Sequence, residues 1–284
     1  MNNLSIHSYC FIPSWTTADG ERALEKAAAA GFGHVVVPLK THAAIEPDKI
    51  ARMFARVGLT PVCSATMLPE ANIASVDREI WAAGVARHRA SLRLARDLGA
   101  RHVGGIVYGL FGKASAPATP EMFRASAEGL ARVAEEAAGF GIRLALEIVN
   151  RYETNLINTV DQGLEMLRLI GAPNVHLHLD TFHMAIEEDD PVAALRKALP
   201  HLAYFELDQN HRGRLDRGTL DFAPMLKLLR EAGYRDLIGV EAFSSAISGP
   251  ETAAGVGAWR NLFDDGSEVA ESAMTVLRRA GWAA

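Results

Sequence analysis

Four acidic residues follow short apolar runs at regular intervals in the second half of the chain, and this spacing constrains the fold more than any other feature. They are Glu147, Asp180, Glu206 and Glu241, separated by 33, 26 and 35 residues. One strand–helix unit of a (β/α)8 barrel takes roughly 30 residues. The four acids are therefore expected at the ends of four successive strands, which converge on one mouth. Carboxylates buried together need a cation to neutralise them, so the spacing predicts a divalent metal site.

Short β-like runs alternate with longer helical patterns along the whole chain. Strands are expected near 4–9, 33–38, 60–65, 102–107, 143–148, 175–180, 202–207 and 237–242. Helices are expected near 18–30, 46–57, 77–98, 119–140, 158–171, 188–198, 221–232 and 266–280. Eight such alternations predict an α/β fold, a (β/α)8 TIM barrel that forms a single domain over residues 1–284.

Glycine residues mark the expected helix ends, because a helix often stops at a residue with left-handed backbone geometry. They are Gly31, Gly58, Gly99, Gly141, Gly171 and Gly233. Two connections, residues 107–118 and 243–260, are longer than is usual in a compact domain. Both follow expected strands, so both should lie at the barrel mouth, where they can cover a substrate.

The composition excludes several classes of protein. The net charge is −5 with acids and bases interspersed, which argues against a nucleic-acid partner. The N-terminal run MNNLSIHSYCF has no signal-peptide pattern, and no apolar run is long enough for a membrane span. The chain has only two cysteines, Cys10 and Cys63, which excludes a disulfide framework. They can be buried residues without a chemical role or an accidental pair. We expect a cytoplasmic protein without a membrane partner.

Several blocks of the chain resemble the ketose 3-epimerases, the D-tagatose, D-psicose and L-ribulose 3-epimerase group of xylose isomerase-like TIM barrels. They are EIVNRYETNLINT (147–159), LDTFHMAIEED (179–189), NHRG…GTLDF (210–222) and VEAF (240–243). The resemblance implies that Glu147, Asp180 and Glu241 are metal ligands and that Glu147 and Glu241 are also the acid–base pair. It further implies that Glu153, His183 and Arg212 contact a small-molecule sugar substrate. We also expect a homodimer or homotetramer.

The chemistry of such an epimerase explains why these residue types are needed. Inversion of C3 in a ketose requires removal of the proton next to the C2 carbonyl. A divalent cation on O2 and O3 stabilises the resulting enediolate. Two carboxylates on opposite faces of C3 can remove one proton and return another. An aldose–ketose isomerase would use the same groups between C1 and C2. A barrel subunit that cleaves 3-keto C-glycosides also begins with proton abstraction beside a carbonyl.

One position departs from the family pattern. The epimerases usually carry a metal-ligand histidine in a run such as Phe-His-Ile-Gly, whereas this chain has Phe205-Glu206-Leu207-Asp208. A shell made of Glu147, Asp180, Glu206 and Glu241 is all oxygen and favours Mn²⁺, with Mg²⁺ and Co²⁺ as alternatives. His211 would reach the metal only after a loop rearrangement. A non-catalytic sugar-binding role remains open if Glu206 disrupts the metal site.

Other residues have competing structural interpretations. We expect His176 and His178 to face outward toward the helices, and Glu187 to Asp190 to open a helix without a chemical role. Gly104 and Gly105 should leave room beside the substrate. Trp15 and Phe111 are equally plausible as apolar walls of the site and as core.

Two further expectations concern function and stability. Because His183 and Arg212 follow strand ends, alanine at either site should change stability by no more than about 1 kcal/mol, as at ordinary surface positions. A barrel nuclease that acts on damaged DNA would need several metal-binding histidines and a basic groove. The acidic balance and the sugar-type motifs argue against that class.

Overall fold

A computed structural model describes residues 3–283 of the chain. Its sheet has eight strands in the order β1 to β8, and all neighbouring pairs are parallel. The strands are β1 (Ser5–His7), β2 (His34–Pro38), β3 (Thr60–Ser64), β4 (His102–Gly104), β5 (Arg143–Ile148), β6 (Val175–Asp180), β7 (Leu202–Leu207) and β8 (Leu237–Val240). A parallel bridge between Leu4 and Ile238 brings the last strand back to the first. The predicted TIM barrel is confirmed.

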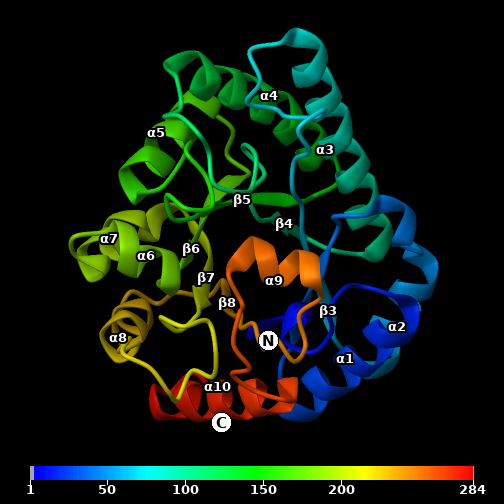
Figure 1. The fold of residues 1–284 in the computed structure, drawn as a ribbon, viewed down its shortest axis with the longest axis vertical. Coiled ribbons are helices and arrows are strands. Elements are labelled where there is room, and N and C mark those ends of the chain that lie inside the picture. Colours follow the sequence, from blue (N-terminus) through cyan, green and yellow to red (C-terminus); the bar gives the residue numbers. More distant parts are fainter. Residues whose placement is uncertain (1–2, 284) are drawn as a thin grey trace.

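Most of the helices form a ring around the barrel, whereas α9 lies across its centre (Figure 1). The helices are α1 (Thr17–Ala30), α2 (Pro47–Val57), α3 (Arg78–Leu98), α4 (Pro120–Gly139), α5 (Val160–Ile170), α6 (Thr181–Glu187), α7 (Pro191–Ala198), α8 (Ala223–Glu231), α9 (Pro250–Val256) and α10 (Gly266–Arg279). Short 3-10 turns occupy Ser8–Cys10, His42–Ala44 and Leu199–His201. All the glycines expected at helix ends have positive φ. None of the helices described over residues 3–283 is long and apolar enough to cross a membrane.

The helix expected near 188–198 begins three residues later in the structure, and a separate short helix that was not expected precedes it. Helix α6 ends at Glu187, and α7 begins at Pro191. The Asp190 side chain caps α7 by accepting from the backbone N–H groups of Val192 and Ala193. Proline suits the first helical turn but breaks a helix interior, which explains why α7 begins at Pro191 instead of near residue 188. The expectation that the acidic run opens a helix therefore holds for Asp190 only, because Glu187 closes the preceding helix.

The histidines of β6 face the barrel interior, so the expectation that His176 and His178 face outward is wrong. Successive side chains of a strand point to opposite faces, and both histidines share the parity of Asp180 at the mouth. His178 is buried and lines the central cavity, whereas His176 is half-buried at the opposite end. The intervening Leu177 and Leu179 belong to the main hydrophobic core.

The end of the barrel opposite the mouth contains a second polar layer. Arg143 donates to Nε2 of His102 at 2.5 Å and forms an ion pair with Asp236. Burial and the Arg143 guanidinium lower the pKa of His102 to about 3. His102 therefore stays neutral at physiological pH and accepts a hydrogen bond from the arginine.

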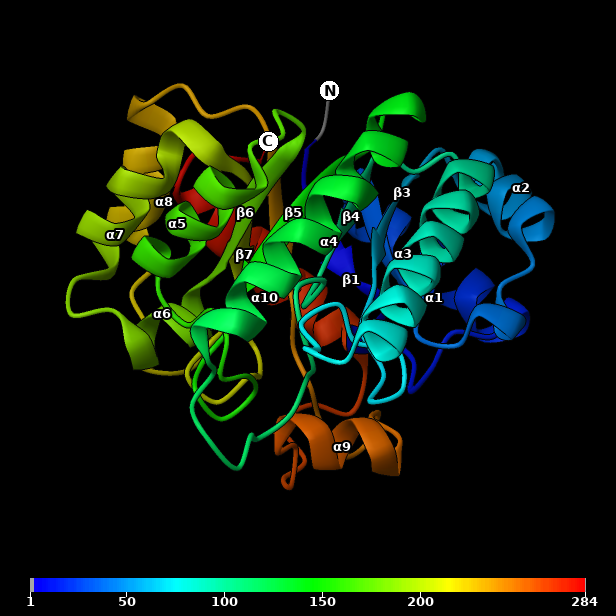
Figure 2. The same cartoon turned by 90° about the horizontal axis from the view of Figure 1, so that it is seen from above.

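The long connection 243–260 forms α9 and lies over the barrel mouth. In Figure 2, α9 lies at one end of the molecule and both termini lie at the other. The Lys40 Nζ contacts an oxygen of Glu251 in α9 at 2.6 Å, linking the helix to the segment after β2. Phe111 lies against Gly255, because a Cβ added there would sit 3.0 Å from its ring. The interpretation of Phe111 as a wall of the site is supported, whereas Trp15 stacks on Phe54 in the core.

Candidate functional site

The four spaced acids converge at the mouth of the barrel. Glu147 is in β5, Asp180 ends β6, Glu206 is in β7, and Glu241 directly follows β8. Asp180 lies in register with Glu206 on the neighbouring strand. Asp180, Glu206 and Glu241 are 0%, 2% and 8% exposed, and Glu147 is partly exposed where it lines the cavity. The topology thus brings the four carboxylates together, as the spacing predicted.

Three overlapping groups of residues offer ligand atoms suited to a cation. Within each group, the ligand atoms all lie within 4.8 Å of one another. The groups are Glu147–Asp180–His183, Glu147–His178–Glu206 and Asp180–Asp208–Glu241. Across residues 3–283, none of these groups contains all four predicted ligands. Oδ2 of Asp180 and Oδ1 of Asp208 are buried without a hydrogen-bond partner among the described residues. Buried carboxylate oxygens without donors fit a cation, because they are otherwise costly to desolvate.

Both oxygens of Glu206 already have partners. Oε2 lies 3.0 Å from Nε2 of His178, and Oε1 accepts from the Tyr204 hydroxyl at 3.3 Å. A Cβ at Gly239 would lie 2.3 Å from the Tyr204 oxygen, so the glycine on β8 is needed to admit this ring. Burial lowers the pKa of His178 to about 3. Neutral His178 therefore orients Glu206 as a hydrogen-bond donor.

Arg212 joins three acids of the mouth and is itself buried. Its guanidinium lies 2.9 Å from Glu153, 2.8 Å from Asp208 and 2.7 Å from Glu241. It lies between the rings of Phe182 and Phe243, at 4.6 and 4.7 Å from their centroids. The residue is 6% exposed, and its backbone φ of 58° is in the left-handed region. The burial of Arg212 contradicts the surface-like environment assumed for its effect on stability, because the loop after β7 folds inward.

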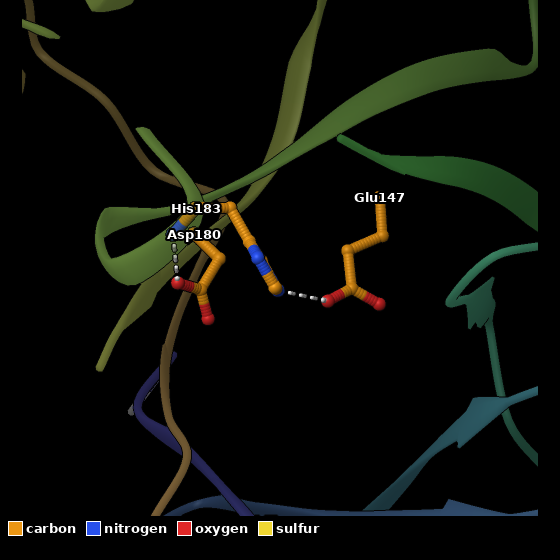
Figure 3. A group of neighbouring side chains, drawn as sticks. All are labelled: Glu147, Asp180 and His183. Carbon is orange, nitrogen blue, oxygen red and sulfur yellow. Dashed lines mark hydrogen bonds and ion pairs between the residues drawn. The ribbon is translucent and has the colours of Figure 1, made fainter. Parts of the chain in front are cut away.

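His183 lies between Asp180 and Glu147 (Figure 3). The backbone and side-chain amides of Asn150 both donate to its Nδ1, at 3.2 and 2.8 Å. Nδ1 is thus an acceptor, which assigns the proton of the neutral ring to Nε2. Burial, with a contribution from Arg212, holds the pKa of His183 well below its usual value. Nε2 lies 3.8 Å from Glu147 and lacks a hydrogen-bond partner among residues 3–283, so it is free to donate to a substrate oxygen.

The burial of His183 also changes its expected effect on stability. The side chain is fully enclosed and fixes Asn150 at the end of β5. An alanine would leave buried donors of Asn150 unsatisfied, which typically costs about 1–3 kcal/mol. The burial of His183 contradicts the surface-like environment assumed in that expectation, and we now expect a larger effect.

His7 is a site residue that the sequence reasoning missed. Its Nδ1 accepts from the backbone N–H of Tyr9 at 3.2 Å, so Nε2 carries the proton and faces Glu241 at 3.8 Å. Burial and Arg212 lower the pKa of His7 to about 3. The position of His7 in β1 could have identified it, because successive side chains of a strand point alternately to the barrel interior and to the helices. Asp208 was missed as a candidate too, although it follows Glu206 by two residues and shares its face.

The electrostatics of the mouth favour a bound cation. Burial raises the pKa of Asp180 to about 7, although Arg212 opposes this shift. Burial and then the charge of Glu241 raise the pKa of Glu147 well above its usual value. Burial also raises the pKa of Glu206, as do the neighbouring carboxylates. Each raised pKa indicates a buried negative charge that the protein does not fully neutralise. A divalent ion would supply the missing positive charge.

Glu147, Glu153, Glu206 and Glu241 line a cavity of about 320 Å³ between the barrel and α9. Its polar wall includes Glu147, Glu153 and Arg212, and its apolar wall includes Met67 and Phe111. A cavity of this size lies at the lower end of the range typical of small-molecule sites. The predicted substrate residues Glu153, His183 and Arg212 also lie together, since Nε2 of His183 is 3.9 Å from Glu153.

Three remaining sequence expectations concern two glycines, His211 and the cysteines. Gly104 and Gly105 line it, as expected for residues that leave room for a ligand. His211 belongs to none of the cation-binding groups, and its Nδ1 accepts from the backbone N–H of Gly213 at 3.0 Å. Cys10 and Cys63 are free and buried.

Comparison with known proteins identifies the family. Residues 24–270 match the model of the xylose isomerase-like TIM barrel. The chain is 36% identical to an L-ribulose 3-epimerase of Mesorhizobium japonicum, over 98% of this chain and 93% of the relative. It is 33% identical to a ketose 3-epimerase of Arthrobacter globiformis, over 93% of each chain. The crystal structure of a D-allulose 3-epimerase from Methylomonas sp. in complex with D-allulose superposes with a TM-score of 0.95 at 32% identity, covering 98% of this chain and 96% of that one. The chain therefore belongs to the ketose 3-epimerase family of carbohydrate epimerases, within the xylose isomerase-like TIM barrels.

Proposed function

We propose that this protein is a divalent-metal-dependent epimerase that inverts C3 of a free ketose or keto-sugar. The observation that carries the proposal is the convergence of Glu147, Asp180, Glu206 and Glu241 at the mouth of a ketose 3-epimerase barrel. In this proposal the four acids are the metal ligands, and Mn²⁺ is the ion that suits an all-oxygen shell. When bound, the ion would polarise the C2 carbonyl and stabilise negative charge on O2 and O3.

Glu147 and Glu241 are proposed as the acid–base pair. They come from β5 and from the residue after β8, so their carboxylates approach the cavity from different sides of the barrel. One carboxylate removes the C3 proton as the C2–C3 enediolate forms. The other carboxylic acid delivers a proton to the opposite face of C3 and restores the carbonyl. The protons and electrons balance, since each turnover exchanges the protonation states of the two residues.

Glu153, His183 and Arg212 are proposed to orient the substrate. The proton on Nε2 of His183 has no partner among residues 3–283, so it can donate to a sugar oxygen. Arg212 presents further donors, and Glu153 accepts from hydroxyl groups. His7 provides a similar donor from the side of Glu241. A sugar held by several directional contacts is positioned for attack at one carbon.

The decisive experiment is incubation of purified protein with Mn²⁺ and a panel of ketoses in D₂O. L-ribulose and D-allulose are the first substrates to test, because relatives carry those names. We expect C3 epimers with deuterium at C3, detected by NMR. Treatment with a chelator should abolish the exchange and Mn²⁺ should restore it.

The same experiment separates the rival activities. Deuterium at C1 or C2 with an aldose product would identify an isomerase and reject the proposal. Cleavage of a 3-keto C-glycoside without ketose epimerisation would identify a lyase subunit instead. A Glu147→Gln variant with a bound ion serves as the control, since it removes one acid–base group without a large change of shape.

A further inference from the structure

We propose that Asp208 is a ligand of the divalent ion and that, with Asp180 and Glu241, it anchors the ion at the inner wall of the mouth. The inference rests on the proposed metal dependence and extends the set of ligands. Asp180, Asp208 and Glu241 each offer a carboxylate oxygen, and these oxygens lie within 4.8 Å of one another. Such spacing allows one cation to contact all three with small side-chain movements.

The two aspartates carry oxygens that the protein itself leaves without a partner. Asp180 and Asp208 are both 0% exposed. Oδ2 of Asp180 and Oδ1 of Asp208 lack hydrogen-bond donors among the described residues. An orphaned carboxylate oxygen in a buried site is expensive unless a cation or proton occupies it. This observation is independent of the spacing and points to a positively charged ligand.

The backbone holds Asp208 in place. Its N–H donates to Oγ1 of Thr181 at 2.9 Å, and the Thr181 hydroxyl contacts the Asp208 carbonyl at 2.8 Å. Thr181 directly follows Asp180, so this pair of contacts fixes the two aspartates relative to each other. Oδ2 of Asp208 accepts from Nε of Arg212 at 2.8 Å, which orients the carboxylate. A ligand supported in this way is preorganised for metal binding.

The charges in the mouth require more compensation than the protein supplies. The carboxylates gathered there are Glu147, Glu153, Asp180, Glu206, Asp208 and Glu241. Among residues 3–283, Arg212 is the one lysine or arginine that forms an ion pair with any of them. One positive charge cannot offset several buried negative charges, so a divalent ion next to Asp208 lowers the cost of burial.

Glu206 differs from Asp208 in this respect. Both Glu206 oxygens are engaged, by His178 and by Tyr204. A cation at Glu206 must compete with those contacts, whereas Oδ1 of Asp208 accepts no hydrogen bond from the described residues. Loss of Asp208 should therefore reduce metal affinity more than loss of Glu206.

The test compares Mn²⁺ affinity in Asp208→Asn and Glu206→Gln, measured from the EPR signal of free Mn²⁺. The asparagine can still accept from Arg212, so orientation is retained while the anionic ligand is lost. Loss of even a supporting residue lowers metal affinity by roughly 10–100-fold. We expect Asp208→Asn to raise Kd at least tenfold and Glu206→Gln to raise it less. Wild-type affinity in Asp208→Asn would overturn the proposal.

A variant of Arg212 distinguishes two roles for Asp208. Asp208 either binds the ion directly or only orients the arginine. Arg212→Gln removes a neighbouring positive charge, so a directly ligated cation should bind as tightly as in wild type or more tightly. If Arg212→Gln weakened Mn²⁺ binding as much as Asp208→Asn, Asp208 would act only by holding the arginine and the proposal would fail.

A second measurement does not depend on the folding of any variant. Anomalous scattering from a wild-type crystal grown with Mn²⁺ should place the ion within about 2.0–2.6 Å of an Asp208 oxygen. An ion outside coordination distance of Asp208 would reject the inference. The result is distinct from that of the deuterium experiment, because metal affinity and ion position are measured without turnover.

Discussion

Replacement of Arg212 by alanine should destabilise the protein by several kcal/mol, because the side chain compensates buried acids. The guanidinium contacts Glu153, Asp208 and Glu241 within 2.9 Å, and the side chain is 7% exposed. Removing one partner of a buried ion pair typically costs about 3–5 kcal/mol. For a domain of this size each kcal/mol lowers Tm by about 2–4 °C, so a fall of about 6–20 °C is expected.

The assay is thermal unfolding by circular dichroism, in chelator and again with Mn²⁺. Because a cation supplies positive charge to the same carboxylates, the fall in Tm should be smaller with the metal than without it. Arg124→Ala is the matched control, since that arginine forms an exposed ion pair with Glu121 on α4. Such pairs contribute little, so its Tm should stay close to that of the wild type. An equally small change in Arg212→Ala would refute the argument from burial.

Three further predictions follow from the site and the opposite end of the barrel. Glu147→Gln and Glu241→Gln should each reduce kcat/KM for the ketose by about 10²–10⁴-fold, and near-normal turnover in either would exclude the two-carboxylate scheme. Glu206→His replaces an anionic oxygen by a neutral nitrogen, so titration should show Co²⁺ and Zn²⁺ gaining affinity relative to Mn²⁺; identical metal profiles would mean that Glu206 does not touch the ion. His102 has a pKa of about 3 when folded and about 6.5 when unfolded, so only the unfolded state gains its proton between those values. The free energy of unfolding should therefore decrease as pH falls through this window, by at most about 1.4 kcal/mol per pH unit from this group. Denaturant unfolding at several pH values should show a shallower dependence in His102→Gln, and an unchanged slope would contradict the assignment.

Much of the architecture could be predicted from local patterns. The alternation of apolar runs and helical periodicity identified every strand of the barrel, since period and glycine placement are properties of neighbouring residues. The regular spacing of Glu147, Asp180, Glu206 and Glu241 located the mouth, because parallel strands bring their carboxyl ends to one side. Strand parity could also have identified His178 and Asp208, which lie two residues from Asp180 and Glu206.

The tertiary structure alone decided how the polar groups of the mouth are paired. Arg212 contacts Glu153, which is 59 residues away, and the loop after β7 must turn inward to allow it. The partners of Glu206 likewise come from a neighbouring strand as well as its own. Whether a carboxylate is engaged or left free depends on which side chains closure of the barrel brings beside it. Local sequence therefore determines which residues reach the mouth, whereas three-dimensional packing determines which of them remain available to a cation or a sugar.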